Sequence, residues 1–269
     1  MENPATIPWL IPLRLGLVQR VLPAYRVPFF DTLARVCSGG LGLFAGQPRP
    51  SEMIETGAQP QSAQLFTARN RHLLSGSFYL CWQSGLLDWL NRWQPAVLVV
   101  EANPRYLALP AAIQWMHARR RAVIGWGLGA PASTGLRAAV RRRFLGQFDA
   151  MIAYSRQGAA QYVAAGLPAK RVFVAPNAVT ARPHDPPPQR PEKYAGGRPT
   201  LLFVGRLQAR KRIDLLLQAC AGLPDDLKPR LWLVATAQRE PSCKPRQSRS
   251  TRRRSSSART TGRTWSLIF

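Results

Sequence analysis

The sequence predicts an α/β protein with a parallel, doubly wound sheet, followed by the start of a second sheet of the same kind. Three observations carry this prediction. Short apolar segments alternate with amphipathic segments between residues 86 and 175. Six prolines then interrupt the pattern within residues 180–199. The alternation resumes at residues 201–221, which read LLFVGRLQARKRIDLLLQACA.

The first part of the chain supplies the elements of one complete domain. Before residue 86 we expect strands at 13–22 and 41–45, a helix at 28–36, a loop at 47–64, and strand-like pieces at 64–67 and 78–82. After it we expect helices at 86–93, 107–119, 134–148 and 157–165, and strands at 96–100, 122–126, 150–154 and 172–175. Ligands of such sheets bind at the carboxyl ends of the strands.

The segment 201–221 has the layout of a phosphate-binding unit. Four apolar residues predict a buried strand that Gly205 ends, a basic turn follows, and an apolar face at helical spacing begins at Ile213. Backbone N–H groups and a helix N-terminus meet an anion in this layout, and Arg206 and Lys211 would add positive side chains. The alternative is an ordinary strand–helix unit with solvated charges.

FVGRL followed by a downstream Lys and an apolar helix resembles the motif that opens the second domain of the group 1 glycosyltransferases. The resemblance implies the GT-B fold, which has two Rossmann-like domains, and a nucleotide-sugar donor. It also implies that Gly205, Arg206 and Lys211 bind the donor diphosphate, that transfer retains the sugar configuration, as in hexosyltransferases, and that no metal or other cofactor is needed.

The resemblance also implies a division of the chain. VFVAPNAV at residues 172–179 is similar to the family segment that precedes the interdomain linker. We therefore expect a Rossmann-like acceptor-side domain at 1–179, a Pro-rich linker at 180–199, and the start of a nucleotide-sugar-binding domain at 200–234. A complete second domain needs about 100 residues, so we expect this one to be incomplete. The Glu-x7-Glu segment of the family is absent.

Residues 235–269 are rich in Arg and Ser and show no helix or strand period, so we expect a disordered basic tail. Three interpretations stay open. The tail could be an arm that binds nucleic acid or an anchor to anionic membrane. It could also be the product of a shifted reading frame, which the nucleotide sequence of the gene would decide.

Composition narrows the class of protein. Hydrophobic residues make up 46% of the chain, which is enough for a packed core. The net charge of +25 favours anionic partners. Four cysteines are scattered without metal-ligand spacing, and the apolar stretch at residues 7–18 lacks the features of a signal peptide or a membrane span. We therefore expect a cytoplasmic protein.

Candidate acceptor-side residues follow two predicted strands. Glu101, Asn103 and Arg105 come after the strand AVLVV, where Glu101 could be a general base or an acceptor hydrogen-bond partner. The alternative for Glu101 is a structural role, in which its carboxylate pairs with a neighbouring Arg at the strand end. Tyr25 and Arg26 lie in the first strand–helix turn, in a Tyr-Arg-Val-Pro-Phe-Phe run that resembles one branch of the family. Many relatives in the family carry a His at the position of Leu128, so the resemblance does not extend to a His base here.

Other charged residues are weaker candidates. The three histidines are dispersed, and only His72, beside Arg69 and Arg71, is an acceptor-site candidate. Arg141, Arg142 and Arg143 lie in an amphipathic helix, which could contact an anionic membrane or simply face solvent. Aromatic residues do not interleave with these runs, so the sequence disfavours nucleic acid.

The sequence therefore favours a glycosyltransferase that acts on a cell-envelope or lipid-linked glycan, and we expect it at the inner face of the cell membrane. One alternative is a non-catalytic fragment of such an enzyme. The other is a basic nucleic-acid-binding protein, which requires the tail to be genuine.

Overall fold

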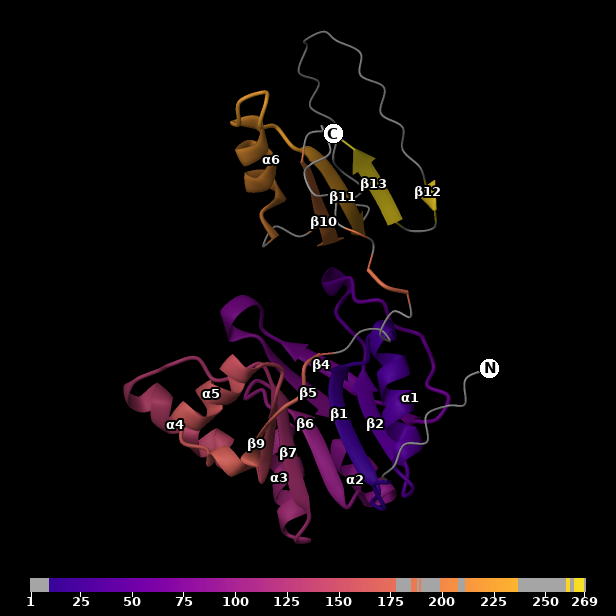
Figure 1. The fold of residues 1–269 in the computed structure, drawn as a ribbon. Helices are drawn as coiled ribbons and strands as arrows, with labels where there is room; N and C mark the ends of the chain where they lie inside the picture. Colours follow the sequence, from indigo (N-terminus) through magenta and orange to yellow (C-terminus); the bar gives the residue numbers. More distant parts are fainter. Residues whose placement is uncertain are drawn as a thin grey trace. The chain divides into compact units, whose positions relative to one another are not determined.

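The chain forms two compact units, Met1–Arg182 and Pro183–Phe269 (Figure 1). The computed structural model describes residues 10–177, 185–187, 189, 199–207, 211–236, 260–261 and 264–268. Most of the predicted linker at 180–199 falls outside these residues, so its role stays a prediction.

A sheet of seven strands forms the centre of the first unit (Figure 1). Its order is β3–β2–β1–β6–β7–β8–β9, and all neighbouring strands are parallel. The strands are β1 (Leu15–Val21), β2 (Leu41–Gly46), β3 (Gln64–Thr67), β6 (Val97–Glu101), β7 (Ala122–Gly127), β8 (Ala150–Ala153) and β9 (Val172–Val174). The chain starts in the middle, runs to one edge and returns to build the other half. This doubly wound Rossmann order confirms the predicted fold class of the first domain.

Helices cover both faces of this sheet. Strand residues alternate between two cores, so that Leu98 and Val100 of β6 face one core and Val99 faces the other. Helix α1 (Val27–Val36) packs in the core with Val99, whereas α2 (Leu86–Trp93), α3 (Leu109–His117) and α5 (Arg156–Ala164) pack in the opposite core. Helix α4 (Gly135–Leu145) buries only Leu145. Among the helices of the described segments, none has the length and hydrophobicity needed to cross a membrane.

A β-hairpin stands apart from the main sheet. Strands β4 (Arg69–Leu73) and β5 (Leu80–Ser84) pair antiparallel, with the 3-10 helix η3 (Gly76–Phe78) between them. The strand-like piece predicted at 78–82 overlaps β5, which begins two residues later, whereas no strand was expected around His72, where β4 lies. The reason is that RNRHL has no apolar alternation, and its strand forms through backbone pairing with β5. The remaining 3-10 helices of this unit are η1 (Ala24–Arg26), η2 (Pro50–Glu52) and η4 (Ala169–Arg171).

The second unit begins with the predicted strand–helix–strand arrangement. Strand β10 (Thr200–Arg206) pairs in parallel with β11 (Arg230–Thr236), and α6 (Ile213–Ala221) connects them. Gly205 does not end the strand as predicted, because Gly205 and Arg206 remain in register with Ala235 and Thr236.

Two short strands extend this second sheet. Strand β13 (Thr264–Ile268) pairs antiparallel with β11, and β12 (Thr260–Thr261) pairs with β13. The expectation of a tail without strands needs correction in these two segments. Their sequence is rich in Thr, Trp and Ile, which favour strands. The rest of the tail from residue 237 lies outside the described residues.

The sheet of the second unit has an exposed apolar face. Leu202 and Val204 of β10 are 61% and 68% exposed, and Trp232, opposite Leu202 on β11, is 42% exposed. Buried apolar side chains in the described part of this unit are Leu231 and Leu233. In these segments, therefore, β11 buries one set of alternate side chains and exposes Trp232.

Candidate functional site

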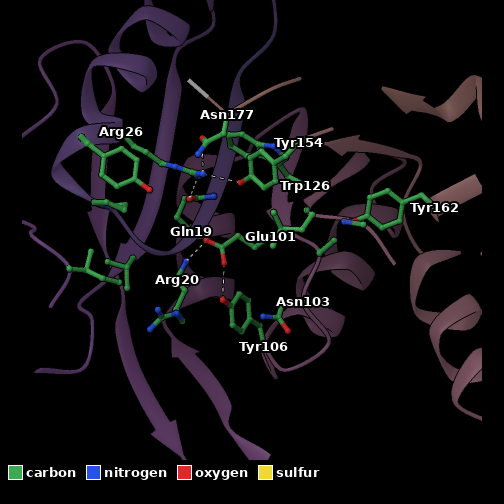
Figure 2. A pocket seen from close by; sticks show the side chains of 18 residues that line it. Gln19, Arg20, Arg26, Glu101, Asn103, Tyr106, Trp126, Tyr154, Tyr162 and Asn177 are labelled. Atoms are coloured by element: carbon green, nitrogen blue, oxygen red, sulfur yellow. Dashed lines mark hydrogen bonds between the residues drawn. The ribbon is translucent and has the colours of Figure 1, made fainter. Parts of the chain in front are cut away.

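The first unit contains a cavity of about 580 Å³ at the carboxyl ends of β1, β6, β7 and β8. Strand β1 lies between β2 and β6. From β1 the chain first adds β2 and β3 toward one edge of the sheet, and it later adds β6 to β9 toward the other edge. Such a topological switch point opens a crevice beyond the strand ends. Figure 2 shows the side chains that line this cavity.

Arg26 connects several elements around the cavity (Figure 2). Its Nη1 donates to Gln19 Oε1 at 2.9 Å, and its Nη2 donates to Tyr154 Oη at 3.0 Å and Asn177 Oδ1 at 3.1 Å. The guanidinium also lies over the Trp126 ring, 5.2 Å from its centroid. A planar guanidinium can donate in several directions while it stacks on an aromatic ring. Arg26 is thus fixed in the cavity wall.

Glu101 ends β6 and faces the same cavity (Figure 2). Its Oε1 accepts from the backbone N–H of Arg20 at 3.2 Å, and its Oε2 accepts from Tyr106 Oη at 2.8 Å. Burial raises the pKa of the Glu101 carboxyl above its ordinary value, and the hydrogen bond from Tyr106 opposes this shift. Among the described residues, Glu101 forms no ion pair with an Arg side chain within 4.0 Å. Its carboxyl combines a raised pKa with access to the cavity, as general bases require.

The other acceptor-side candidates do not all lie in the cavity. Tyr25 and Asn103 line the cavity, and Tyr25 is 50% exposed. Arg105 is exposed and does not line it. The backbone explains this difference. The N–H of Tyr106 donates to the carbonyl of Asn103 at 3.1 Å and closes a tight turn, and Arg105 lies in this turn with its side chain in solvent. Asn103 Oδ1 accepts from the backbone N–H of Arg105.

Two donors in the cavity wall lack partners. Gln19 is 3% exposed and Trp126 is 8% exposed, and both line the cavity. Neither Gln19 Nε2 nor Trp126 Nε1 has a hydrogen-bond partner. Buried donors without partners are uncommon because each loses its bonds to water, at a cost of about 1–3 kcal/mol. Both nitrogen atoms are inaccessible to solvent, so they lie behind the cavity surface and a ligand in the cavity does not reach them in this structure.

Sequence reasoning missed several residues of this wall. The cavity is also lined by Gln19, Arg20, Tyr106, Trp126, Tyr154, Tyr162 and Asn177. Gln19 and Arg20 carried a signal, since they are polar residues at the carboxyl end of an apolar strand. The Arg20 side chain turns to Glu52, with Nη1 and Oε2 2.8 Å apart, while its backbone contacts Glu101.

The candidate diphosphate residues lie in the second unit. Gly205 and Arg206 are in β10, and Lys211 is exposed just before α6. The side chain of Arg206 lies outside the described structure. At the start of α6, Arg212 Nη2 lies 3.1 Å from Asp214 Oδ2. Of the two predicted diphosphate ligands Arg206 and Lys211, the structure thus describes the side chain of Lys211.

The histidines do not assemble a site. His72 Nδ1 lies 2.9 Å from Tyr79 Oη, and His72 lines a separate cavity with Arg49 and Arg69. His117 Nε2 lies 3.1 Å from Asp149 Oδ2, while His184 lies outside the described residues. Within the described residues, no cluster of three or more His, Cys, Asp or Glu could hold a metal ion.

Comparison with known proteins gives matches to solved structures alone. No protein-family model matches the chain, and no curated protein does. HepE from Anabaena, solved with UDP and glucose, has 13% identity and a TM-score of 0.47, with 84% of this chain and 60% of HepE covered. The lipopolysaccharide outer core galactosyltransferase WaaB has 13% identity and a TM-score of 0.45, with 81% and 59% covered.

Both are GT-B glycosyltransferases. The UDP-GlcNAc 2-epimerase of Methanocaldococcus jannaschii also matches, at 12% identity and a TM-score of 0.35, with 60% of this chain and 44% of the epimerase covered. This chain spans about 60% of the length of HepE and WaaB. At these identities and TM-scores, the likenesses carry no conclusion about the activity of this chain.

Proposed function

We propose that this protein is a glycosyltransferase that moves a sugar from a nucleotide-sugar to an acceptor. The observation that carries the proposal is the convergence of Arg26, Glu101 and Asn103 in one cavity at the switch point. The FVGR segment, with Lys211 before the following helix, supports the donor side through its family resemblance.

In this proposal the first unit holds the acceptor. An acceptor hydroxyl placed near Glu101 would lose its proton as the oxygen bonds to the anomeric carbon of the donor sugar. The raised pKa of the Glu101 carboxyl makes its ionised form a stronger base. Arg26, Asn103 and Tyr25 would orient the acceptor, with Arg105 as a contact outside the cavity wall.

The second unit would hold the leaving group. Breaking the bond between the anomeric carbon and the diphosphate leaves additional negative charge on the diphosphate. Arg206 and Lys211 would neutralise that charge, and the backbone at Gly205 would lie beside it. We propose that transfer requires no metal or other cofactor and retains the sugar configuration, as the family resemblance implies. Retention requires the acceptor oxygen to bond to the anomeric carbon on the same face from which the diphosphate leaves.

We further propose that the acceptor is a cell-envelope or lipid-linked glycan and that the protein works in the cytoplasm, at the inner face of the membrane. Helix α4 supports peripheral membrane contact, because Leu136 and Val140 are exposed beside Arg137 and Arg141. The free thiols of Cys37, Cys81 and Cys220 fit a reducing compartment.

Calorimetric titration of the purified chain with UDP-glucose, UDP-galactose and GDP-mannose tests the function. We expect nucleotide-sugars with one kind of nucleotide to bind. We also expect the nucleoside diphosphate to be released, and this release should be faster when acceptor is present. The absence of binding to every nucleotide-sugar would overturn the proposal. Binding without release of diphosphate would instead favour a non-catalytic protein, and tight, salt-sensitive RNA binding would favour a nucleic-acid partner.

A non-catalytic role is the second candidate. It is favoured by the small core in the described part of the second unit, where Leu231 and Leu233 are the buried apolar side chains. A domain with so little buried apolar area gains little stability from folding. In this case nucleotide-sugar binding would be weak, and no turnover would accompany it.

A further inference from the structure

A second cavity adjoins the first in the same unit. It has a volume of about 480 Å³ and shares Ala102, Gly129 and Tyr162 with the wall of the first cavity. The rest of its wall is mainly apolar and includes Pro104, Pro131, Leu136, Val140, Phe144 and Leu145. The two cavities therefore adjoin each other, one polar and one apolar, and we name the second the α4 groove.

Gly129 marks the junction of the two cavities. Its φ of +132° is rarely adopted by other residues, and an added Cβ would lie 2.9 Å from Gly158 Cα. Its backbone N–H donates to Tyr162 Oη at 3.1 Å, which holds this junction in place. The backbone between the two cavities is thus fixed by the fold, because a side chain at Gly129 would be strained and would meet Gly158.

The wall of the α4 groove exposes apolar surface. Leu136 is 79% exposed and Val140 is 59% exposed. They are four residues apart, so they lie on one side of α4. In this helix Leu145 is the buried residue. Exposing two large aliphatic side chains beside a groove is unfavourable unless an apolar ligand covers them.

The groove also carries positive charge. Arg137 and Arg141 line it, and Arg141 donates through Nη1 to the carbonyl of Pro131. In the adjoining cavity, Arg26 and Asn103 supply polar groups. A single occupant complementary to both cavities has a polar, anionic headgroup at one end and an apolar chain at the other end.

We propose that the α4 groove binds the apolar chain of an anionic amphiphile whose polar headgroup occupies the adjoining cavity. This deepens the proposed function, on which it rests for the identification of the amphiphile as the acceptor. Contact of α4 with a flat membrane surface alone fits less well, because it would cover Leu136 and Val140 but leave this cavity of about 480 Å³ unfilled.

The test uses the full chain without nucleotide-sugar and the single-chain probes butyl, octyl and dodecyl phosphate, each below its micelle concentration. Calorimetry or Trp fluorescence reports binding. We expect affinity to rise about fourfold for each added methylene until the groove is filled. Inorganic phosphate should bind much more weakly than dodecyl phosphate. Affinity that does not depend on chain length would overturn the proposal.

Variants locate the binding site. L136Q and V140Q, together, should weaken dodecyl phosphate binding about tenfold or more and leave butyl phosphate binding unchanged. L87Q is the matched control, because Leu87 is 40% exposed on α2, away from the groove. An equal loss in the control, or no loss in the double variant, would contradict the proposal. Circular dichroism melting checks that each variant is folded.

Two further outcomes separate the possibilities. If the chain binds phosphatidylglycerol-containing vesicles through Leu136 and Val140 but binds no single-chain probe, the groove proposal is wrong and α4 is a membrane contact. If dodecyl phosphate binds as expected but no nucleotide-sugar binds, the glycosyltransferase proposal fails while the groove proposal stands.

Discussion

Arg26 Nη2 donates to Asn177 Oδ1 across 3.1 Å, although 151 positions separate the two residues in the chain. The bond connects the first strand–helix turn to the segment that follows the last strand of the first unit. Arg26 also contacts Gln19 and Tyr154. One side chain thus holds together loops that follow three different strands.

Replacing Arg26 with Lys should therefore lower the free energy of unfolding. A single ammonium group cannot reach the same three acceptors and stack on Trp126, so we expect a loss of about 1–3 kcal/mol. Urea unfolding measures this loss. R35K is the control, because Arg35 is exposed on α1 and bonds through Nη2 to Thr32. Similar losses in the two variants would show that the Arg26 contacts are not special.

Glu101→Gln should change how stability depends on pH. The folded-state pKa of Glu101 is raised above 4.5, so its stabilising effect is complete at low pH and is lost as pH rises through the raised value. Glutamine does not ionise; its carbonyl oxygen can accept from the backbone N–H of Arg20, and its amide nitrogen can donate to Tyr106 Oη, which reverses that bond. As pH rises, the free energy of unfolding of the variant should therefore increase relative to that of the native protein. Urea unfolding at several pH values measures this difference.

The same variant tests catalysis. If Glu101 is the general base, E101Q should slow transfer by about 10²–10⁴-fold. The control is E55Q, since Glu55 is an exposed carboxyl that does not line the cavity. Normal transfer by E101Q, with its altered pH dependence of stability, would assign Glu101 a structural role alone.

Asp31→Asn should destabilise the first unit by about 1–3 kcal/mol. Asp31 is 8% exposed and accepts from the backbone N–H groups of Gln61, Ser62 and Ala63. Burial would raise its pKa, but these hydrogen bonds outweigh burial and lower it. The stabilisation is therefore present above the ordinary pKa of 3.8 and is lost as pH falls through the lowered value.

Acid unfolding followed by circular dichroism checks this sign. The native protein should lose stability as pH falls through that range, and D31N should lose less because asparagine does not titrate. D88N on α2 replaces an exposed carboxylate and should behave like the native protein. A D31N variant as stable as D88N would contradict the prediction.

Lys211→Ala tests the donor side. If Lys211 contacts the diphosphate, its removal should weaken nucleotide-sugar binding about tenfold or more and reduce the dependence of binding on salt. K228A is the control in the same unit, where Lys228 Nζ pairs with Asp225 at 2.6 Å. Calorimetric titration at two salt concentrations gives both quantities. Equal affinities in the two variants would remove Lys211 from the site.

Much of the fold could be predicted because local periodicity and turn residues agree. Helix α2 has the predicted bounds, Leu86–Trp93, and the positive φ angles of Gly85 and Gln94 explain its two ends. Strand β4 could not be predicted, since RNRHL pairs through its backbone with β5 and shows no apolar pattern. The same lack of long-range information explains why the antiparallel strand β13 was not expected.

Part of the candidate site could also be predicted from the sequence, and part could not. The rule that ligands meet the carboxyl ends of strands led to Tyr25, Arg26, Glu101 and Asn103, and all four line one cavity. Asn177 could not be placed there, because its contact with Arg26 depends on how the sheet folds back on itself. The orphaned state of Gln19 Nε2 is also a tertiary property, since it arises from the absence of a nearby acceptor.

The cavity wall has a consequence for how such a protein can diversify. Tyr25, Asn103 and Leu128 all lie outside the strands, in segments that follow three different strands. Substitutions in one segment can change what the cavity recognises while the apolar residues of the sheet and the contacts of Arg26 stay the same. Specificity for new ligands can therefore evolve one loop at a time, with little risk to folding.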